Sequence, residues 1–206
     1  MTKIYSLTFA GNYGHDDYDG KFLGSIEKIP TSVTELCRLN RIPGLEKPST
    51  LDFRSGNLTR LKISNIANVN VSLDVLSKDL LDVISNVGRV HWTLVPVRFL
   101  CENGKDCSNG RFSGVFLNEH LDCFDYEKSV YKMKDWSQMP QDKVNDRMRK
   151  KVRSVRELYL REPDPGFPPY FRLLAMPTRL YISQSTHEAI LEANLVGLNM
   201  TLIGDF

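Results

Sequence analysis

The chain has 206 residues, of which 41% are hydrophobic, and its 27 basic and 25 acidic residues give a formal net charge of +2. This composition suits one folded domain, residues 1–206, and a charge so near zero excludes a general attraction to nucleic acid. No apolar stretch approaches the ~20 residues of a membrane helix, and glycines and acids come too early for a secretory signal, so we expect a cytoplasmic protein without a membrane partner.

The first part of the chain alternates strand signals with turn signals. Residues 3–9 have strand composition and run into a glycine-rich segment, which predicts a strand followed by an exposed loop. Ser32 and Glu35 have the spacing of a capping box, which predicts a short helix within 30–40. Residues 57–77 are rich in β-branched residues that alternate imperfectly, as in a half-buried strand or hairpin.

A helix and two strands are predicted next. Ser77 as N-cap and Gly88 as C-terminal stop predict a helix between them. Residues 89–100 read as a strand, in which Pro96 requires an edge or a bulge because proline cannot donate to a central ladder. A further strand is predicted over 111–118.

The clearest periodicity lies in residues 141–160. Apolar residues recur there at spacings of four, four, three and three, which aligns them on one face of a helix. These residues are Val144, Met148, Val152, Val155 and Leu158. Eight lysines and arginines fall between 143 and 161. We therefore predict a basic amphipathic helix, whose interleaved acids weaken its positive patch.

The last quarter contains two strands around a helix. Four prolines within 161–170 end the basic segment in an extended loop, and 171–183 is again strand-like. Ser185 and Glu188 fit a capping box, and Gly197 is expected to end that helix in a left-handed conformation before a final strand. Strands and helices in this order predict an α+β fold with a mainly antiparallel sheet and several helices packed on it.

Most enzyme chemistries find little support in the sequence. Ser185 and His187 belong to a helix start, because a nucleophilic serine needs an oriented base, oxyanion donors and a strained turn, which are missing around it. A Cys₃His zinc site would need Cys101, Cys107, His120 and Cys123, but five residues separate the first pair instead of the usual two to four. We expect no metal and no cofactor.

Two alternatives stay open beside a purely protein-binding function. His120, Asp122 and Asp125 form a group that an acid–base enzyme could use, although a docking surface would carry the same residues. The basic segment 143–161 could belong to an RNA-binding module, but no RNP-like strand or helix-turn-helix pattern accompanies it. We therefore expect no nucleic-acid partner.

Several segments resemble the immunity proteins of bacterial polymorphic-toxin systems, and are closest to the eleventh immunity family and its relatives. The segments are 75–84, 93–99, 120–131, 168–183 and 187–203. The positions that match the pattern are Ser77, Leu80, Ile84, Asp125, Ser129, Phe171, Arg172, Ser183, Ile190 and Gly197. The resemblance covers about residues 70–206, whereas 1–70 shows no familiar pattern. It implies a protein that binds and neutralises a co-produced toxin in the producing cell, without catalysis.

Two acidic and aromatic segments are the expected contacts with such a toxin, because tight interfaces combine aromatic anchors with complementary charge. They contribute Tyr13, Asp16, Asp17, Tyr18 and Asp19, and then Glu119, Asp122, Asp125 and Tyr126. The basic segment 143–161 is the alternative contact, which would suit an acidic toxin.

Overall fold

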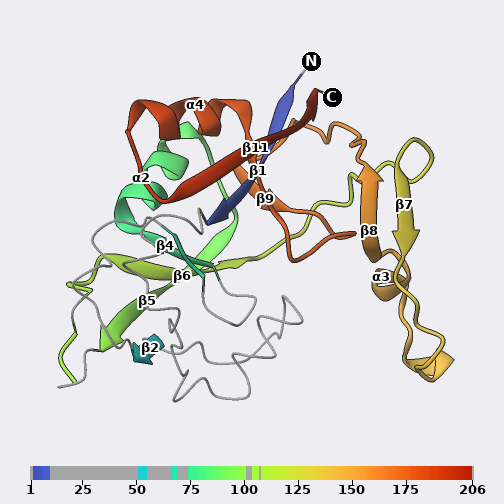
Figure 1. The fold of residues 1–206 in the computed structure, drawn as a ribbon, viewed down its shortest axis with the longest axis horizontal. Coiled ribbons are helices and arrows are strands. Elements are labelled where there is room, and N and C mark those ends of the chain that lie inside the picture. Colours follow the sequence, from blue (N-terminus) through green and yellow to red (C-terminus); the bar gives the residue numbers. More distant parts are fainter. Residues whose placement is uncertain are drawn as a thin grey trace.

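The computed structural model describes residues 2–9, 51–54, 66–68, 74–100, 104–106 and 108–205 (Figure 1). Several sequence predictions lie outside these residues: the exposed loop after the first strand, the helix within 30–40, the toxin-binding segment 13–19, the 57–65 part of the strand or hairpin, and the cysteine pair Cys101 and Cys107. In the described chain no helix is both long enough and apolar enough to cross a membrane.

The first sheet joins the two ends of the chain. Its order is β11-β1-β10-β9, and all its pairings are antiparallel. The strands are β1 (Lys3–Phe9), β9 (Tyr170–Arg172), β10 (Leu180–Ser183) and β11 (Leu198–Asp205). The strand-like segment 171–183 is thus two short strands, separated by a turn around Pro177.

The second sheet has the order β2-β5-β6-β4-β3, and only the β2–β5 pairing is parallel. Its strands are β2 (Leu51–Arg54), β3 (Ile66–Asn68), β4 (Asp74–Ser77), β5 (Trp92–Leu100) and β6 (Phe112–Leu117). The predicted hairpin is the β3–β4 pair. Pro96 lies in β5, which is an inner strand of this sheet. Among the described residues the pairing of β5 with β2 begins at Val97, so Pro96 is paired with β6 only.

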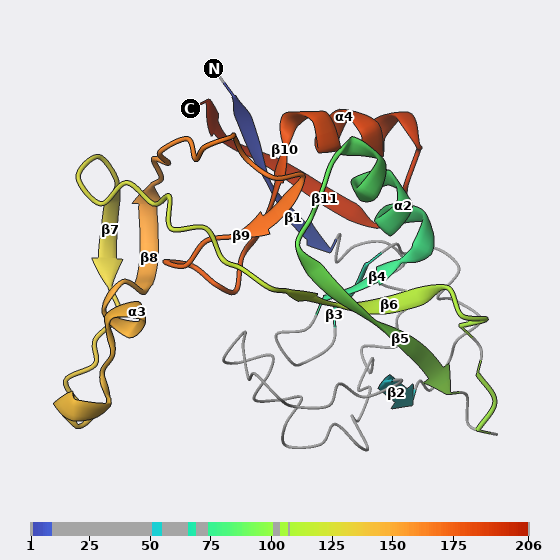
Figure 2. The same cartoon turned by 180° about the vertical axis from the view of Figure 1, so that it is seen from behind.

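Two helices pack beside these sheets: α2 (Lys78–Val87) and α4 (Gln184–Glu192) (Figure 2). Ser77 caps α2 as predicted, because its Oγ accepts a hydrogen bond from the Leu80 amide at 3.2 Å. The predicted cap of α4 is wrong. Its N-cap is Ser183, whose Oγ accepts from the Thr186 amide at 3.3 Å, so the helix begins directly after β10 and Ser185 lies in its first turn.

The predicted end of α4 also needs correction. The helix stops at Glu192, and the left-handed residue after it is Asn194, with φ of 52°. The Asn194 amide donates to the Leu191 carbonyl at 3.1 Å, which satisfies one of the last helical carbonyls. Gly197 is left-handed as expected, with φ of 80°, but it turns the chain into β11 and does not cap the helix.

Within the first sheet, the inner strand β10 is buried on both faces. All four of its residues are buried, and its first three alternate between two apolar clusters. Leu180 and Ile182 face a cluster that also contains residues of α2, α4 and β6, whereas Tyr181 faces a second cluster built around Phe124 and Leu173. A strand buried on both sides explains the continuous apolar run LYIS.

A third, two-stranded sheet pairs β7 (Val130–Met133) with β8 (Val152–Glu157). Between them lie a 3-10 turn, η2 (Gln141–Lys143), and one helical turn, α3 (Asp146–Arg149). The long basic helix predicted over 141–160 is therefore wrong, since most of its second half is strand. The α+β class with mainly antiparallel pairing is confirmed, although the described strands form three sheets instead of one.

Candidate functional site

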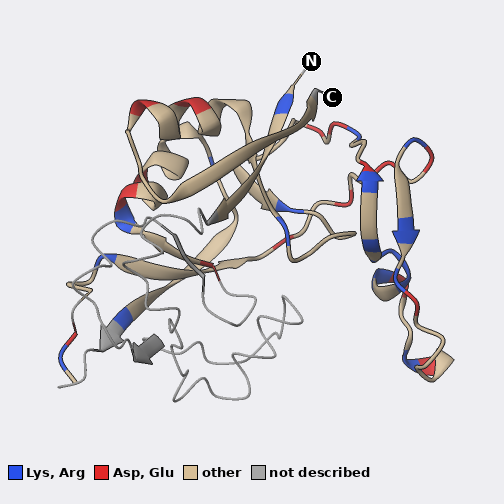
Figure 3. Cartoon of the chain, in the orientation of Figure 1, with Lys and Arg blue, Asp and Glu red and all other residues tan. Residues whose placement is uncertain are grey.

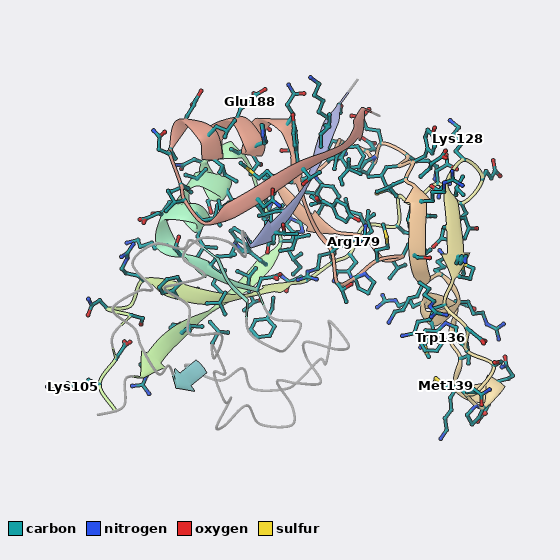
Figure 4. The ribbon with its side chains drawn as sticks, in the orientation of Figure 1. Lys105, Lys128, Trp136, Met139, Arg179 and Glu188 are labelled. Carbon is teal, nitrogen blue, oxygen red and sulfur yellow. The ribbon has the colours of Figure 1, made fainter. Side chains whose placement is uncertain are left out.

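Residues 130–157, which comprise β7, η2, α3 and β8, form an arm at one side of the molecule. Figures 1 and 2 show its tip reaching away from the first two sheets. Figure 4 places Lys128 next to the upper end of the arm and Trp136 and Met139 towards its lower end. Most residues of the arm are exposed.

The arm concentrates positive charge. It contains nine lysines and arginines against four acidic residues, a net charge of +5, whereas the whole chain carries +2. The remainder is therefore net negative. Figure 3 shows the basic residues along β7, β8 and α3.

Most of these cations have no ionic partner in the part of the chain that the structure describes. Among the described residues, Lys150 is the single member of the nine with a carboxylate at ion-pair distance, that of Asp122. The acids interleaved in the arm therefore form no ion pair with its bases among the described residues, although hydrogen bonds from Ser137 and, to a smaller extent, the charge of Arg153 lower the pKa of Asp135. Unpaired surface cations leave a positive potential that an acidic partner can meet.

The pairing of β7 with β8 explains how the arm presents its arginines. Tyr131 pairs with Val155 while Val130 pairs with Glu157, so Arg156 is an extra residue in β8. In the same way, Lys132 pairs with Ser154 and Met133 with Val152, so Arg153 is a second extra residue. Each step is a β-bulge, which breaks the strict alternation of the strand. Both arginines are exposed.

The opposite face of the arm rests on the body. Tyr131, Val152 and Val155 are partly buried against the second apolar cluster. The Val152 amide also donates to the Ala175 carbonyl at 2.9 Å. This contact distinguishes an inner face from an outer face, which we define by the exposed residues Lys132, Arg153, Ser154 and Arg156.

Apolar side chains are exposed beside the cations. Val130 is 44% exposed, Met133 is 43% exposed and Tyr159, which follows β8, is 43% exposed. Apolar groups next to charges are typical of protein interfaces, in which apolar contact supplies affinity and charge supplies orientation.

The base of the arm is held by aromatic packing. The ring centroid of Phe124 lies 4.6 Å from that of Tyr126 and 5.3 Å from that of Tyr131. The Tyr126 hydroxyl donates to the Lys150 carbonyl at 2.6 Å, and this bond ties the segment between α3 and β8 to the body. Ser129 adds a pair of bonds, since its Oγ donates to the Tyr159 carbonyl at 3.2 Å and accepts from the Tyr159 amide at 3.0 Å.

The second predicted toxin-binding segment lies at this base, but its residues differ in role. Glu119 is exposed, and Asp122 is exposed and bonded to the Lys150 ammonium group. Asp125 is only 9% exposed, so its predicted exposure is wrong. Its Oδ1 accepts from the amides of Lys128 at 3.1 Å and Glu127 at 3.0 Å, which closes a turn.

These surroundings also fix the protonation of the segment. The amides of Lys128 and Glu127 hold the pKa of Asp125 below its usual value, so it stays ionised. Burial, with a smaller effect from Asp122, raises the pKa of Tyr126 to about 12. Tyr126 is therefore a neutral, half-buried hydrogen-bond donor.

The residues of the enzymatic alternative are not brought together by direct contact. All three are described, and no hydrogen bond or ion pair joins His120 to Asp122 or Asp125. Burial, and then the positive charges of Arg172, Lys151 and Arg147, lowers the pKa of His120 to about 4. The imidazole is therefore neutral at pH 7.

The described half of the proposed zinc set gives no sign of a site. Burial raises the pKa of the Cys123 thiol to about 12, so Cys123 is a protonated core residue. Within the described ranges no group of three or more histidine, cysteine or acidic residues is placed to hold a metal ion.

Sequence reasoning missed the tip of the arm. Trp136 donates through Nε1 to the Met148 carbonyl at 2.8 Å, and the Lys134 ammonium group lies 4.5 Å from the centre of its ring. The sequence did contain a signal for this tip. Trp136 stands in a turn-rich segment that ends at Pro140, and such a segment is more typical of a loop between two strands than of the start of a helix.

Comparison with known proteins adds no family assignment. The chain matches no protein-family model, and no curated protein is significantly similar to it in sequence.

Proposed function

We propose that this protein is a non-catalytic immunity protein that binds a co-produced toxin in the cytoplasm and neutralises it. The observation that carries the proposal is the arm, a braced two-stranded element with exposed apolar side chains and with cations that, among the described residues, mostly have no carboxylate at ion-pair distance. Such a surface is suited to docking on another protein.

The residues that carry the family resemblance support this division between scaffold and binding surface. Ser77 and Ser183 cap helices, Asp125 closes a turn, Ser129 joins two loops and Arg172 forms a buried ion pair. Each holds the fold together, and each is buried. The shared pattern therefore describes a scaffold, and the arm is left to vary with the partner.

The geometry of the acidic residues favours this function over the enzymatic alternative. Asp122 is engaged with Lys150, and Asp125 is engaged with two backbone amides. An acid–base pair needs a group whose pKa lies near the working pH and that can reach the substrate, whereas Asp125 is held ionised in a turn.

Co-expression tests the proposal. The toxin encoded by the adjacent upstream gene is produced in a bacterial host with or without this protein, and growth is recorded. We expect growth arrest with the toxin alone and rescue in the presence of this protein, together with a stable complex of the two purified proteins. Toxicity that persists at full expression of this protein, with no complex formed, would contradict the function.

A further inference from the structure

We infer that the outer face of the arm docks on an acidic surface of the toxin, with Arg153 and Arg156 as the main contacts. This inference rests on the proposed function, and it specifies which of the two surfaces left open by the sequence makes the contact. The proposed toxin contact is therefore the basic segment, and not the acidic segment around Asp122 that the sequence favoured.

The two β-bulges are the first reason. Each inserts one additional residue into β8, and in each case that residue is an arginine. Bulges are local irregularities that re-aim side chains, and they recur at functional positions. With Lys132, which is exposed on the neighbouring strand, they place three exposed cations on the paired strands β7 and β8.

The second reason is that these cations are available. No described carboxylate lies within ion-pair distance of Arg153, Arg156 or Lys132. A planar guanidinium group can bind a carboxylate through two parallel hydrogen bonds, and arginine is enriched among the residues that dominate binding energy. Carboxylates of the partner are thus the natural ligands of this face.

Positive charges of the arm also act on two groups near its inner side. Burial, and then the charge of Lys134, lowers the pKa of Lys151, and Lys151 and Arg147 add to the effect of burial and of Arg172 on the pKa of His120.

A protein fits this face better than RNA does. Binding of single strands relies on exposed aromatic faces for base stacking. Here Tyr126 and Tyr131 pack against each other and Phe124, and Lys134 covers Trp136. Of the exposed apolar side chains next to the cations, Val130 and Met133 are aliphatic and Tyr159 alone is aromatic, which is less than a row of stacked bases requires.

The whole-chain charge distribution supports the same orientation. The arm carries +5 while the rest of the chain is net negative, so an acidic partner is attracted to the arm and repelled elsewhere. Such asymmetry raises the rate of productive encounter.

Stopped-flow association of the purified protein with the purified toxin tests the inference. We expect the double variant Arg153→Glu with Arg156→Glu to associate at least about tenfold more slowly than the wild type, with a weaker salt dependence. The matched control is Lys78→Glu with Arg89→Glu, which changes the net charge equally at exposed positions of the body. We expect the control rate to stay within about twofold.

A second double variant, Arg153→Gln with Arg156→Gln, removes the two charges without reversing them and is therefore less able to disturb folding. Circular dichroism checks that each variant is folded. The inference is overturned if wild-type protein binds but the arm and control variants behave alike. It is also overturned if the arm variants lose binding to a single-stranded RNA oligonucleotide and keep binding to the toxin. Absence of toxin binding by the wild type instead contradicts the proposed function itself.

Discussion

At the residue scale, His120 shows how its neighbours set the charge of a side chain. It is half-buried beside the base of the arm, and burial together with Arg172, Lys151 and Arg147 lowers its pKa from 6.5 to about 4. The folded protein therefore resists protonation of His120 at a pH at which the unfolded chain accepts it. That difference links folding to pH.

We predict that His120 makes the protein less stable as the pH falls from about 6.5 to about 4. The unfolded chain binds the proton throughout this interval and the folded chain does not, so unfolding is favoured by on the order of 2 kcal/mol. Urea unfolding at about pH 7 and about pH 4.5 measures the loss. His120→Gln should lose less over the same interval, and equal losses in both proteins would count against the shifted pKa.

Residue identity predicted the cap of α2 but not that of α4, and it did not predict the burial of Asp125. The Ser77 cap follows from a serine placed just before an amphipathic run, and the structure confirms it. Asp125 looked like a surface acid, yet its carboxylate is turned back to the amides of Lys128 and Glu127. Nothing in the sequence distinguishes an aspartate that closes a turn from one that faces solvent, because both occur beside aromatic residues in loops.

At the element scale, the bulges explain why a strand looked like a helix. Val152, Val155 and Leu158 lie three residues apart, and this spacing is typical of a helical face. In the structure Val152 and Val155 share the inner face of β8 because one extra arginine falls between successive inward residues, and Leu158 follows at the same interval. A bulged strand thus imitates helical periodicity. The β-branched valines were the counter-signal.

Substitutions at Ser154 separate a strand from a helix by the sign of their effects. Ser154 is exposed and pairs with Lys132 across the sheet. We predict that Ser154→Val stabilises the protein and Ser154→Ala destabilises it, each by a few tenths of a kcal/mol, since β-branched residues favour strands. In a helix the order is reversed, because alanine is the best helix former. Urea unfolding of both variants gives the order.

At the scale of the whole molecule, one buried ion pair connects the first two sheets. Asp74 lies in β4 of the second sheet, and its Oδ2 accepts hydrogen bonds from Arg172 and, at 3.1 Å, from the Tyr170 hydroxyl, both in β9 of the first sheet. Arg172 also donates to the Pro177 carbonyl. Both arginine and aspartate are largely withdrawn from water, so each depends on the other.

This connection could not be derived from the sequence, since 98 residues separate Asp74 from Arg172. The fold class followed from the order of strand and helix signals, but the division into three sheets depends on such long-range contacts. Arg172 is one of the positions on which the proposed resemblance to immunity proteins rests, whereas Asp74 lies one residue before the first of those segments and was not singled out.

We predict that Asp74→Ala lowers the free energy of unfolding by about 3–5 kcal/mol, because it leaves a buried guanidinium group without its carboxylate. Asp74→Asn should cost less, since the amide oxygen can still accept from Tyr170. Asp82→Ala, at an exposed position of α2, is the control and should change stability by less than about 0.5 kcal/mol. Urea unfolding at neutral pH compares the three variants. Similar values for Asp74→Ala and Asp82→Ala would show that the ion pair does not hold the two sheets together.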